Sequence, residues 1–230
     1  MRPGSISFVI PMYNESRGIA AVVSELTVMA ERLTGDYEII IADDASTDES
    51  AKIVREIAAK DPRVKLERLE KNSKFGGALR KGIARAGKEI IIYTDSDLPI
   101  TMQNLEEALP LLNEADIVTA YSTIRKGETL KRVIMSKVYN FLIRFLFKTK
   151  IKDINSGFKI YKKKIFQDVQ LLSNSPFVDV EIFVESIKRG FTVKQYPIIF
   201  RNRHHGKSYI SRPAVIFQTM LDMMRLWLRR

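Results

Sequence analysis

The strongest constraint on the fold is an alternation of short β-branched runs with longer helical segments over the first 120 residues. The runs are Ser5–Ile10, Tyr37–Ala42, Val64–Leu69, Glu89–Thr94 and Asp116–Tyr121. The helical segments between them are Ser16–Leu33, Thr47–Lys60, Phe75–Ala86 and Asn104–Asn113. Strands that alternate with helices in this way form a mostly parallel sheet with right-handed crossovers. We therefore predict an α/β, Rossmann-like fold in which helices flank a central sheet.

The rest of the sequence is less regular and predicts further elements around the same sheet. These are a basic helix Leu130–Lys148, a short strand through Tyr161, a helix near Val180–Lys188, a strand Thr192–Phe200, a basic loop Arg201–Arg212 and a final helix Ala214–Arg230. No internal repeat or linker-like segment divides the chain. We predict one domain over residues 1–230 with a C-terminal elaboration.

The composition supports a globular protein and removes several kinds of site. With 45% apolar and 28% charged residues, a chain of 230 residues can bury one large core. The absence of Cys excludes thiolate nucleophiles, disulfides, zinc fingers and iron–sulfur sites. A bound metal would then be a hard cation such as Mg²⁺ or Mn²⁺ with oxygen ligands.

The net charge of +11 is unevenly distributed along the chain. Residues 1–100 hold 15 basic and 16 acidic side chains, whereas residues 101–230 hold 23 and 11. This asymmetry indicates a polyanionic partner: nucleic acid, anionic lipid or a phosphorylated substrate. A nucleic-acid-binding module is the non-enzyme alternative. We disfavour it because the basic half lacks interleaved aromatic residues on strands, and the acidic loops would repel phosphate unless metal is bound.

Two predicted helices, 130–148 and 214–230, have broad apolar arcs opposite a polar stripe. The stripes are Lys137, Asn140, Arg144 and Lys148 on the first helix, and Gln218, Asp222, Arg225 and Arg229 on the second. The arcs exceed what one core contact needs, and basic flanks with Trp227 are typical of an interfacial helix. No apolar run reaches the ~20 residues of a spanning helix, and the N-terminus lacks the pattern of a secretory signal. We predict a cytosolic or peripheral protein that contacts a membrane surface.

Acidic side chains follow two of the predicted strands, at the sheet edge where parallel α/β folds bind ligands. Asp95-Ser96-Asp97 ends one strand, and its two carboxylates at i and i+2 can converge on a divalent cation and a diphosphate. Asp43-Asp44 ends another, where an Asp commonly bonds the ribose or base of a nucleotide.

Two further features suit helix starts near that edge. Either Ser46 or Asp48 suits the N-cap of the helix that begins near Thr47. The pair Gly76-Gly77 opens the next helix and would let its amides approach a phosphate.

These motifs, in this order and spacing, resemble glycosyltransferase family 2 enzymes of the GT-A fold, and within them the dolichyl-phosphate mannose synthases and related polyprenyl-phosphate glycosyltransferases. The resemblance spans essentially the whole chain and begins with the strand and loop Val9–Glu15. It implies that Mg²⁺ or Mn²⁺ binds Asp95 and Asp97. The residues implied to contact the nucleotide sugar are Pro11, Tyr13, Glu15, Asp43, Asp44, Gly77, Asp95, Ser96, Asp97, Arg203 and Lys207.

The second half carries the motifs that resemble the lipid-phosphate enzymes. Arg132 and Ser136 are similar to the Arg-x-x-x-Ser element for the acceptor phosphate, and Arg125 occupies the place of a second acceptor-phosphate arginine. Residues 153–158 resemble the Asp-x-x-Ser-Gly-Phe loop, and residues 203–208 resemble a loop implied to close over the donor diphosphate. The implied catalytic residues are Asp97, Arg125, Arg132, Ser136 and Arg203. The implied division is a nucleotide-sugar half 1–122, an acceptor half 123–212 and an amphipathic helix 213–230.

The resemblance implies an inverting transfer of a hexose to a polyprenyl or dolichyl phosphate at the cytosolic face of a membrane. Mannose from GDP-mannose is the leading donor, and glucose from UDP-glucose is the second. A family 2 transferase that acts on a glycan hydroxyl is the alternative, and it would need a carboxylate base, with Asp179 or Glu181 as the candidate. These two acids equally suit the N-terminus of a helix. Whether a separate membrane subunit presents the lipid stays open.

Overall fold

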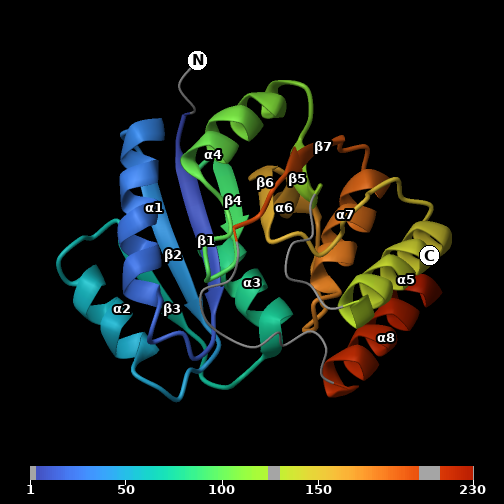
Figure 1. The fold of residues 1–230 in the computed structure, drawn as a ribbon, viewed down its shortest axis with the longest axis horizontal. Coiled ribbons are helices and arrows are strands. Elements are labelled where there is room, and N and C mark those ends of the chain that lie inside the picture. Colours follow the sequence, from blue (N-terminus) through green and yellow to red (C-terminus); the bar gives the residue numbers. More distant parts are fainter. Residues whose placement is uncertain (1–3, 124–129, 202–212, 230) are drawn as a thin grey trace.

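The computed structural model describes residues 4–123, 130–201 and 213–229, with 130–132 and 213 described by their backbone alone (Figure 1). Its described residues form a seven-stranded sheet in the order β3-β2-β1-β4-β6-β5-β7. The strands are β1 (Ile6–Met12), β2 (Tyr37–Asp43), β3 (Val64–Arg68), β4 (Ile90–Thr94), β5 (Ile117–Ser122), β6 (Phe158–Lys162) and β7 (Val193–Ile198). Only β6 is antiparallel to its neighbours in this sheet. The predicted mostly parallel α/β sheet is confirmed.

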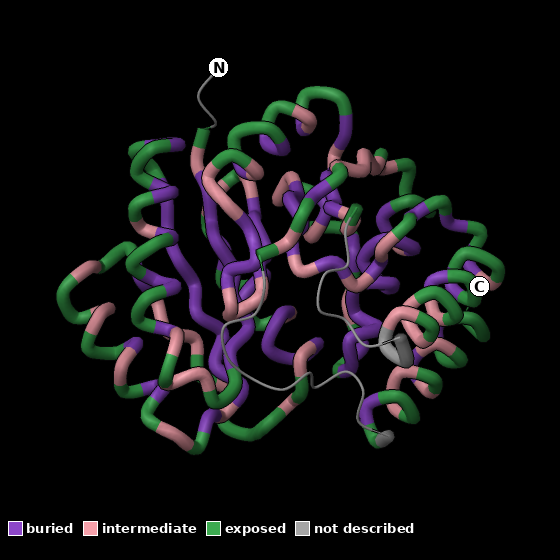
Figure 2. Tube along the Cα trace, in the orientation of Figure 1, coloured by how far each residue is buried: buried purple, intermediate pink, exposed green. Residues whose placement is uncertain are grey.

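Helices cover both faces of the sheet. One face carries α1 (Ile19–Leu33), α2 (Ser50–Ala58), α4 (Met102–Ala108) and the 3₁₀ turn η1 (Leu109–Asn113). The other carries α3 (Lys74–Arg85), α5 (Leu130–Phe147), the short α6 (Ile165–Asp168), α7 (Val178–Lys188) and α8 (Pro213–Leu228). The sheet is therefore the middle layer of three, and its central strands are buried while the outer helix surfaces are exposed (Figure 2).

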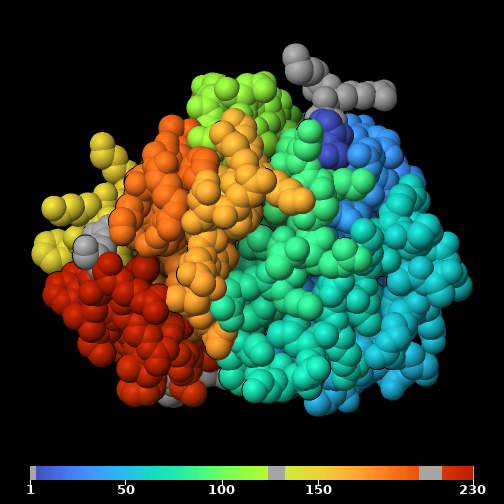
Figure 3. Space-filling model, turned by 180° about the vertical axis from the view of Figure 1, so that it is seen from behind, coloured from blue at the N-terminus to red at the C-terminus, as the bar shows by residue number. Residues whose placement is uncertain are grey.

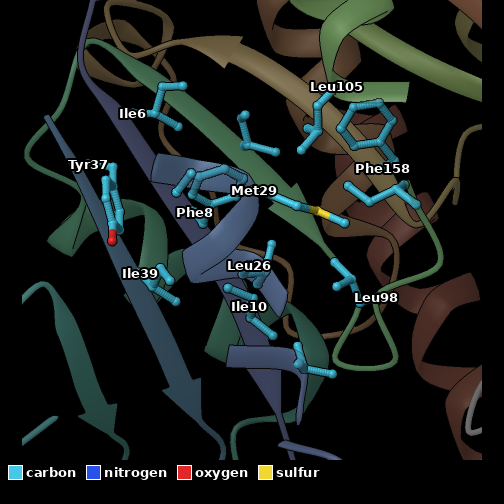
Figure 4. Packing of buried hydrophobic residues seen from close by; sticks show 14 of the residues in the cluster. Ile6, Phe8, Ile10, Leu26, Met29, Tyr37, Ile39, Leu98, Leu105 and Phe158 are labelled. Atoms are coloured by element: carbon cyan, nitrogen blue, oxygen red, sulfur yellow. The ribbon is translucent and has the colours of Figure 1, made fainter. Parts of the chain in front are cut away.

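Alternate residues of each central strand enter separate cores on the two faces. Phe8 and Ile10 of β1 pack under α1, where Figure 4 shows Leu26 and Met29 lying over them. Val9, between them in sequence, belongs to the core on the opposite face. Side chains two apart share a face of a strand. Because both faces are covered, the strands read as continuous apolar runs, which is why the sequence located them.

Strand β1 is longer than predicted, and this opens the sheet next to the acidic loops. It continues through Pro11, which is buried, to Met12. Pairing with β2 extends to Met12, whereas pairing with β4 ends at Val9. The Met12 carbonyl accepts a hydrogen bond on the β2 side of the strand, so the backbone of the preceding Pro11 faces the β4 side. Strand β4 no longer pairs with β1 at that point. The N–H that proline lacks is therefore not needed for a hydrogen bond within the sheet. From β1 the chain continues to β2, and from β4 it continues to β5, which lies beyond β4 in the opposite direction along the sheet. Such switch points are where α/β sheets bind ligands.

The two predicted amphipathic helices form, but their polar stripes do not simply face solvent. Asn140 of α5 and Asp222 of α8 are 5% and 4% exposed. Asn140 Oδ1 accepts a hydrogen bond from the Ile154 amide at 3.1 Å, and Asp222 Oδ2 accepts one from Ser175 Oγ at 2.7 Å. Each helix thus docks partly through a buried polar contact, which leaves apolar side chains outside. Within the described residues, no helix is both long and apolar enough to span a bilayer.

Candidate active site

The described loops that are predicted to bind the nucleotide sugar and the metal meet at one edge of the sheet. The carboxyl ends of the six parallel strands and the amino end of the antiparallel β6 lie there. Five described non-glycine residues have positive φ, and four of them follow strands at this edge: Asn14 (56°), Ala45 (58°), Lys74 (66°) and Leu98 (43°). Such conformations cost energy for L-residues and cluster where loops are shaped for function.

The loops after β1 and β2 are fixed to each other. The Asn14 amide donates to Ser46 Oγ at 2.9 Å, and the Glu15 amide donates to Ser50 Oγ at 2.8 Å. Asp48 Oδ1 accepts a hydrogen bond from the Ser50 amide at 3.0 Å. Helix α2 begins at Ser50 and its N-cap residue is Glu49, so neither Ser46 nor Asp48 takes the predicted N-cap position. Burial raises the pKa of Asp48, but hydrogen bonds, chiefly from Ser50, outweigh it and lower the pKa overall.

The two carboxylates at the end of β2 tie this loop to its neighbours. Asp43 is fully buried; its Oδ1 accepts from the Ser46 amide at 3.0 Å and its Oδ2 lies 3.5 Å from Nε of Arg68. Asp44 Oδ1 accepts from the Ser73 amide at 2.6 Å. Burial raises the pKa of Asp44, and the Ser73 hydrogen bond opposes that rise. Their predicted contact with a nucleotide stays a prediction.

Asp95 is held from two directions at the end of β4. Its Oδ1 accepts a hydrogen bond from the buried Tyr93 phenol, and its amide donates to the Gly157 carbonyl at 3.3 Å. A Cβ on Gly157 would lie only 2.6 Å from Asp95 Oδ2. Burial, and then the charge of Asp95, raise the pKa of the Tyr93 phenol well above its usual value, so the phenol stays a donor. Two motifs that are distant in sequence, 95–97 and 153–158, therefore lie in direct contact.

A buried ion pair lies behind Asp95. Lys159 Nζ is 3.0 Å from Asp179 Oδ2 and donates to the Ser156 carbonyl at 2.6 Å. The same Nζ lies 4.9 Å from the centre of the Tyr93 ring. Burial raises the pKa of Asp179 to about 6, and Lys159 opposes the rise. The sequence reading missed Lys159, although a lone Lys inside an apolar strand run was a signal that a buried counter-ion exists.

The second candidate base, Glu181, also has partners within the protein. Its Oε2 accepts from the amides of Leu172 and Ser173, both at 2.9 Å. Asp179 and Glu181 both lie in the first turn of α7, as predicted, and are 2% and 3% exposed. The helix-start interpretation of these two acids fits their contacts.

The paired glycines let α3 pack closely on another loop. The Gly76 amide donates to the Asn174 carbonyl at 2.8 Å, and a Cβ on Gly76 would lie 2.4 Å from the Ser173 carbonyl oxygen. A Cβ on Gly77 would lie 2.5 Å from Cβ of Ser73. This packing accounts for both glycines without a ligand, and the role of Gly77 in donor binding stays a prediction.

Helix α5 contains the predicted acceptor element and contacts the loop that lies against the predicted metal motif. Ser136 is half-buried, and its carbonyl accepts from Asn140 Nδ2 at 3.0 Å. Asn140 also holds the Ile154 amide, in the loop whose Gly157 lies against Asp95. Arg132 lies on the same helix, one turn before Ser136. Arg125, Arg203 and Lys207 lie outside the described residues.

Asp95, Ser96 and Asp97 are half-buried at this edge, with Tyr13 exposed and Glu15 half-buried after β1. In the part of the chain that the structure describes, no group of three or more His, Asp or Glu side chains is arranged to hold a metal. Mg²⁺ and Mn²⁺ need no such group, because one or two carboxylates with substrate phosphates and water suffice for hard cations. The two carboxylates of Asp95 and Asp97 fit that donor set.

The fold matches solved structures of sugar-transferring enzymes. Glucosyl-3-phosphoglycerate synthase from Mycobacterium tuberculosis, in complex with Mn²⁺, UDP-glucose and phosphoglyceric acid, superposes with a TM-score of 0.75. The match covers 97% of this chain and 79% of that chain at 18% identity. It confirms the predicted GT-A fold.

Curated relatives match over most of this chain. Glycosyltransferase AglD of Haloferax volcanii is 29% identical over 96% of it, and dolichyl-phosphate beta-glucosyltransferase ALG5C of Trichomonas vaginalis is 28% identical over 89%. Polyprenol monophosphomannose synthase of Mycolicibacterium smegmatis is 25% identical over 88%. The matched regions span 37%, 66% and 80% of the three relatives' own lengths.

The model of the family described as "Glycosyl transferase family 2" matches residues 7–170, which is more than half of the chain. The matched range contains the loops after β1, β2 and β4 and the loop that precedes β6. The chain belongs to glycosyl transferase family 2.

Proposed function

We propose that this chain transfers a hexose from a nucleotide sugar to the phosphate of a polyprenyl or dolichyl phosphate, with inversion and with Mg²⁺ or Mn²⁺. The observation that carries the proposal is the connection from Asp95, through the loop at Gly157 and Asn140, to the helix of Ser136. It links a donor and metal motif to an acceptor-phosphate motif. The polyprenol and dolichyl-phosphate enzymes among the relatives support this acceptor class.

In the proposed reaction, an acceptor phosphate oxygen attacks the anomeric carbon of the sugar while the bond from that carbon to the donor diphosphate breaks. A phosphate monoester has a second pKa of about 6 and is largely ionised near neutral pH, so cations matter more than a base. Arg125, Arg132 and Arg203 would hold phosphate oxygens, with Ser136 as a further donor. When bound at Asp95 and Asp97, the divalent cation would supply charge neutralisation for the departing diphosphate.

Transfer to a glycan hydroxyl is less well supported, because it requires a carboxylate that can take a proton from the acceptor. Asp179 pairs with Lys159, and Glu181 holds two backbone amides. We propose mannose from GDP-mannose as the first donor to test, and glucose from UDP-glucose as the second. The mannose synthase and the glucosyltransferase among the relatives support one donor each.

The reaction is tested by incubation with Mn²⁺ or Mg²⁺, a short polyprenyl phosphate and a panel of labelled nucleotide sugars. We expect label from one donor to enter the organic phase, and chelation of the metal to stop it. The matched control is the polyprenol without phosphate, which should accept nothing. If no donor labels the lipid phosphate, or if the free alcohol is labelled equally well, the proposal is wrong.

We also propose a membrane partner for the exposed apolar surface of α5 and α8, which lie side by side at one end of the molecule (Figures 1 and 3). Of the sixteen exposed large apolar side chains in the described residues, eleven are on these two helices. They are Ile134, Val138, Phe141, Leu142, Phe145, Ile216, Phe217, Met220, Met224, Trp227 and Leu228. Patches of this kind mark interaction sites. Together with the basic second half, they favour the anionic cytosolic leaflet that would hold the acceptor.

Replacing Phe145 and Phe217 with glutamate should weaken co-sedimentation with anionic liposomes by at least about tenfold, which corresponds to about 1.4 kcal/mol. The two side chains are 72% and 64% exposed, so the loss reflects contact outside the fold. The matched control is Val28→Glu, at an exposed apolar position on α1 where the side chain is 57% exposed. Equal liposome binding by the double variant and the control would contradict the proposed membrane contact of α5 and α8.

A further inference from the structure

The buried polar groups behind Asp95 are not used by the proposed reaction. We infer that Tyr93, Lys159 and Asp179 form a positioning network that holds the Asp95 carboxylate in one orientation for a divalent cation. The inference rests on the proposed function, since it assigns these residues to the same metal site. None of the three is proposed to touch substrate or metal, so they act through Asp95.

The first step is the contact between Tyr93 and Asp95. Residues two apart on an extended strand share a face, so the Tyr93 phenol can reach the carboxylate that follows β4. It donates to Oδ1, while Oδ2 lies against the backbone of Gly157. The two oxygens are therefore fixed by different neighbours, which restricts the rotation of the carboxylate.

The second step is how Tyr93 itself is held. Tyr93 is 2% exposed, with Phe75 edge-on at 6.0 Å between ring centres. Lys159 is its partner across the β4–β6 ladder, and the Lys159 ammonium faces the Tyr93 ring at 4.9 Å. Asp179 and the Ser156 carbonyl fix that ammonium. One cation thus links strand β4, which precedes Asp95, with the loop at 156–157 and helix α7.

The third step is that stability alone does not explain these buried polar groups. A buried ion pair rarely stabilises a fold more than apolar residues of the same size would. The surrounding core on this face is apolar, with Val9 and Ile91 among its residues, and a phenylalanine would fill the volume of Tyr93. The hydrogen bonds of Tyr93 and Lys159 instead reach Asp95, Asp179 and the 156–157 loop. Groups behind a metal ligand commonly set its orientation, and their loss costs about 10- to 100-fold in metal affinity.

The test is Tyr93→Phe, with Tyr161→Phe as the matched control. Tyr161 is equally buried on the adjacent strand β6, and its hydroxyl has no hydrogen-bond partner among the described residues. Mn²⁺ affinity is measured by electron paramagnetic resonance in the presence of nucleoside diphosphate. We expect the Kd for Mn²⁺ to rise about tenfold in Tyr93→Phe. We expect no change in Tyr161→Phe, and a thermal midpoint in both within a few degrees of the parent.

Transfer rates measured over a range of Mn²⁺ separate positioning from general damage. In Tyr93→Phe the Mn²⁺ requirement should rise while the rate recovers at saturating Mn²⁺; a merely structural defect would lower the rate at every concentration. The double variant Lys159→Met/Asp179→Leu removes both buried charges together. It should fold at least as well as the parent and still bind Mn²⁺ more weakly.

The outcomes distinguish the two proposals. If the parent protein binds Mn²⁺ and transfers sugar, but Tyr93→Phe binds Mn²⁺ with the same Kd, the positioning network is refuted and the proposed function stands. If the parent binds no Mn²⁺ and labels no lipid phosphate with any donor, the proposed function is wrong. The positioning network is then wrong too, because there is no metal site for it to serve.

Discussion

We expect replacement of Asp97 with alanine to lower kcat/KM for sugar transfer by about a thousandfold or more and to leave the protein folded. The proposed metal site has only two carboxylates, so the loss of one removes most of the charge neutralisation at the donor diphosphate. Charge neutralisation by a metal ion stabilises the transition state by several kcal/mol, and about 4 kcal/mol corresponds to a thousandfold change in rate. Asp97 is half-buried, outside both apolar core clusters, so its removal should move the thermal midpoint by only a few degrees.

The matched control for this substitution is Asp168→Ala. Asp168 is an exposed acid on α6, which follows the opposite end of β6 from the loop at Gly157. It should leave both the transfer rate and the thermal midpoint unchanged. If Asp97→Ala unfolds the protein instead, residues 95–97 are a structural turn and the metal site lies elsewhere.

The sequence predicted the sheet to within one or two residues at most strand ends, and the physical reason is burial. Central parallel strands covered on both faces carry apolar residues at successive positions, and such runs stand out from the helical periodicity between them. The four-residue helix α6 was not predicted, because so short a segment shows no helical period. The position of β6 between β4 and β5 was not predicted either, since a strand pattern says nothing about its neighbours.

The sequence pattern did not predict which polar residues are buried. Asn140 and Asp222 belong to the polar stripes of the two amphipathic helices, and helical periodicity normally assigns such residues to solvent. Their partners, Ile154 and Ser175, are 14 and 47 residues away in sequence, so no local pattern shows that the contacts exist. Tertiary hydrogen bonds overrode the amphipathic pattern at these two positions.

The same limit applies to the candidate site. The motif 95–97 was located by its place after a strand, and the loop 153–158 by resemblance to family 2 enzymes. That the two touch depends on the antiparallel course of β6, which brings its amino end beside the carboxyl end of β4. Lys159 lies in that strand and was not predicted to belong to the site.

The contact between Gly157 and Asp95 gives the second large effect. Replacing Gly157 with alanine would place a Cβ 2.6 Å from Asp95 Oδ2 and 3.1 Å from its Cγ, so one of the two must move. The carboxylate is the end of a side chain and can swing aside, whereas the Gly157 carbonyl is tied to the Asp95 amide. We expect a loss of about a hundredfold in kcat/KM, the scale of a 1 Å misplacement at a reacting centre. The thermal midpoint should change little.

Gly35→Ala is the matched control, because a Cβ on Gly35 would meet nothing within 4 Å and its φ lies outside the left-handed region. It should be neutral for transfer and for stability. Transfer rates and thermal melts of the two variants then separate the steric effect on Asp95 from the general effect of replacing a glycine. A fully active Gly157→Ala would mean that Asp95 tolerates displacement, which would contradict its assignment as a metal ligand. Loss of activity with an intact fold, absent from Gly35→Ala, would place the loop before β6 in the metal site, because the closest contacts of the new Cβ are with that carboxylate.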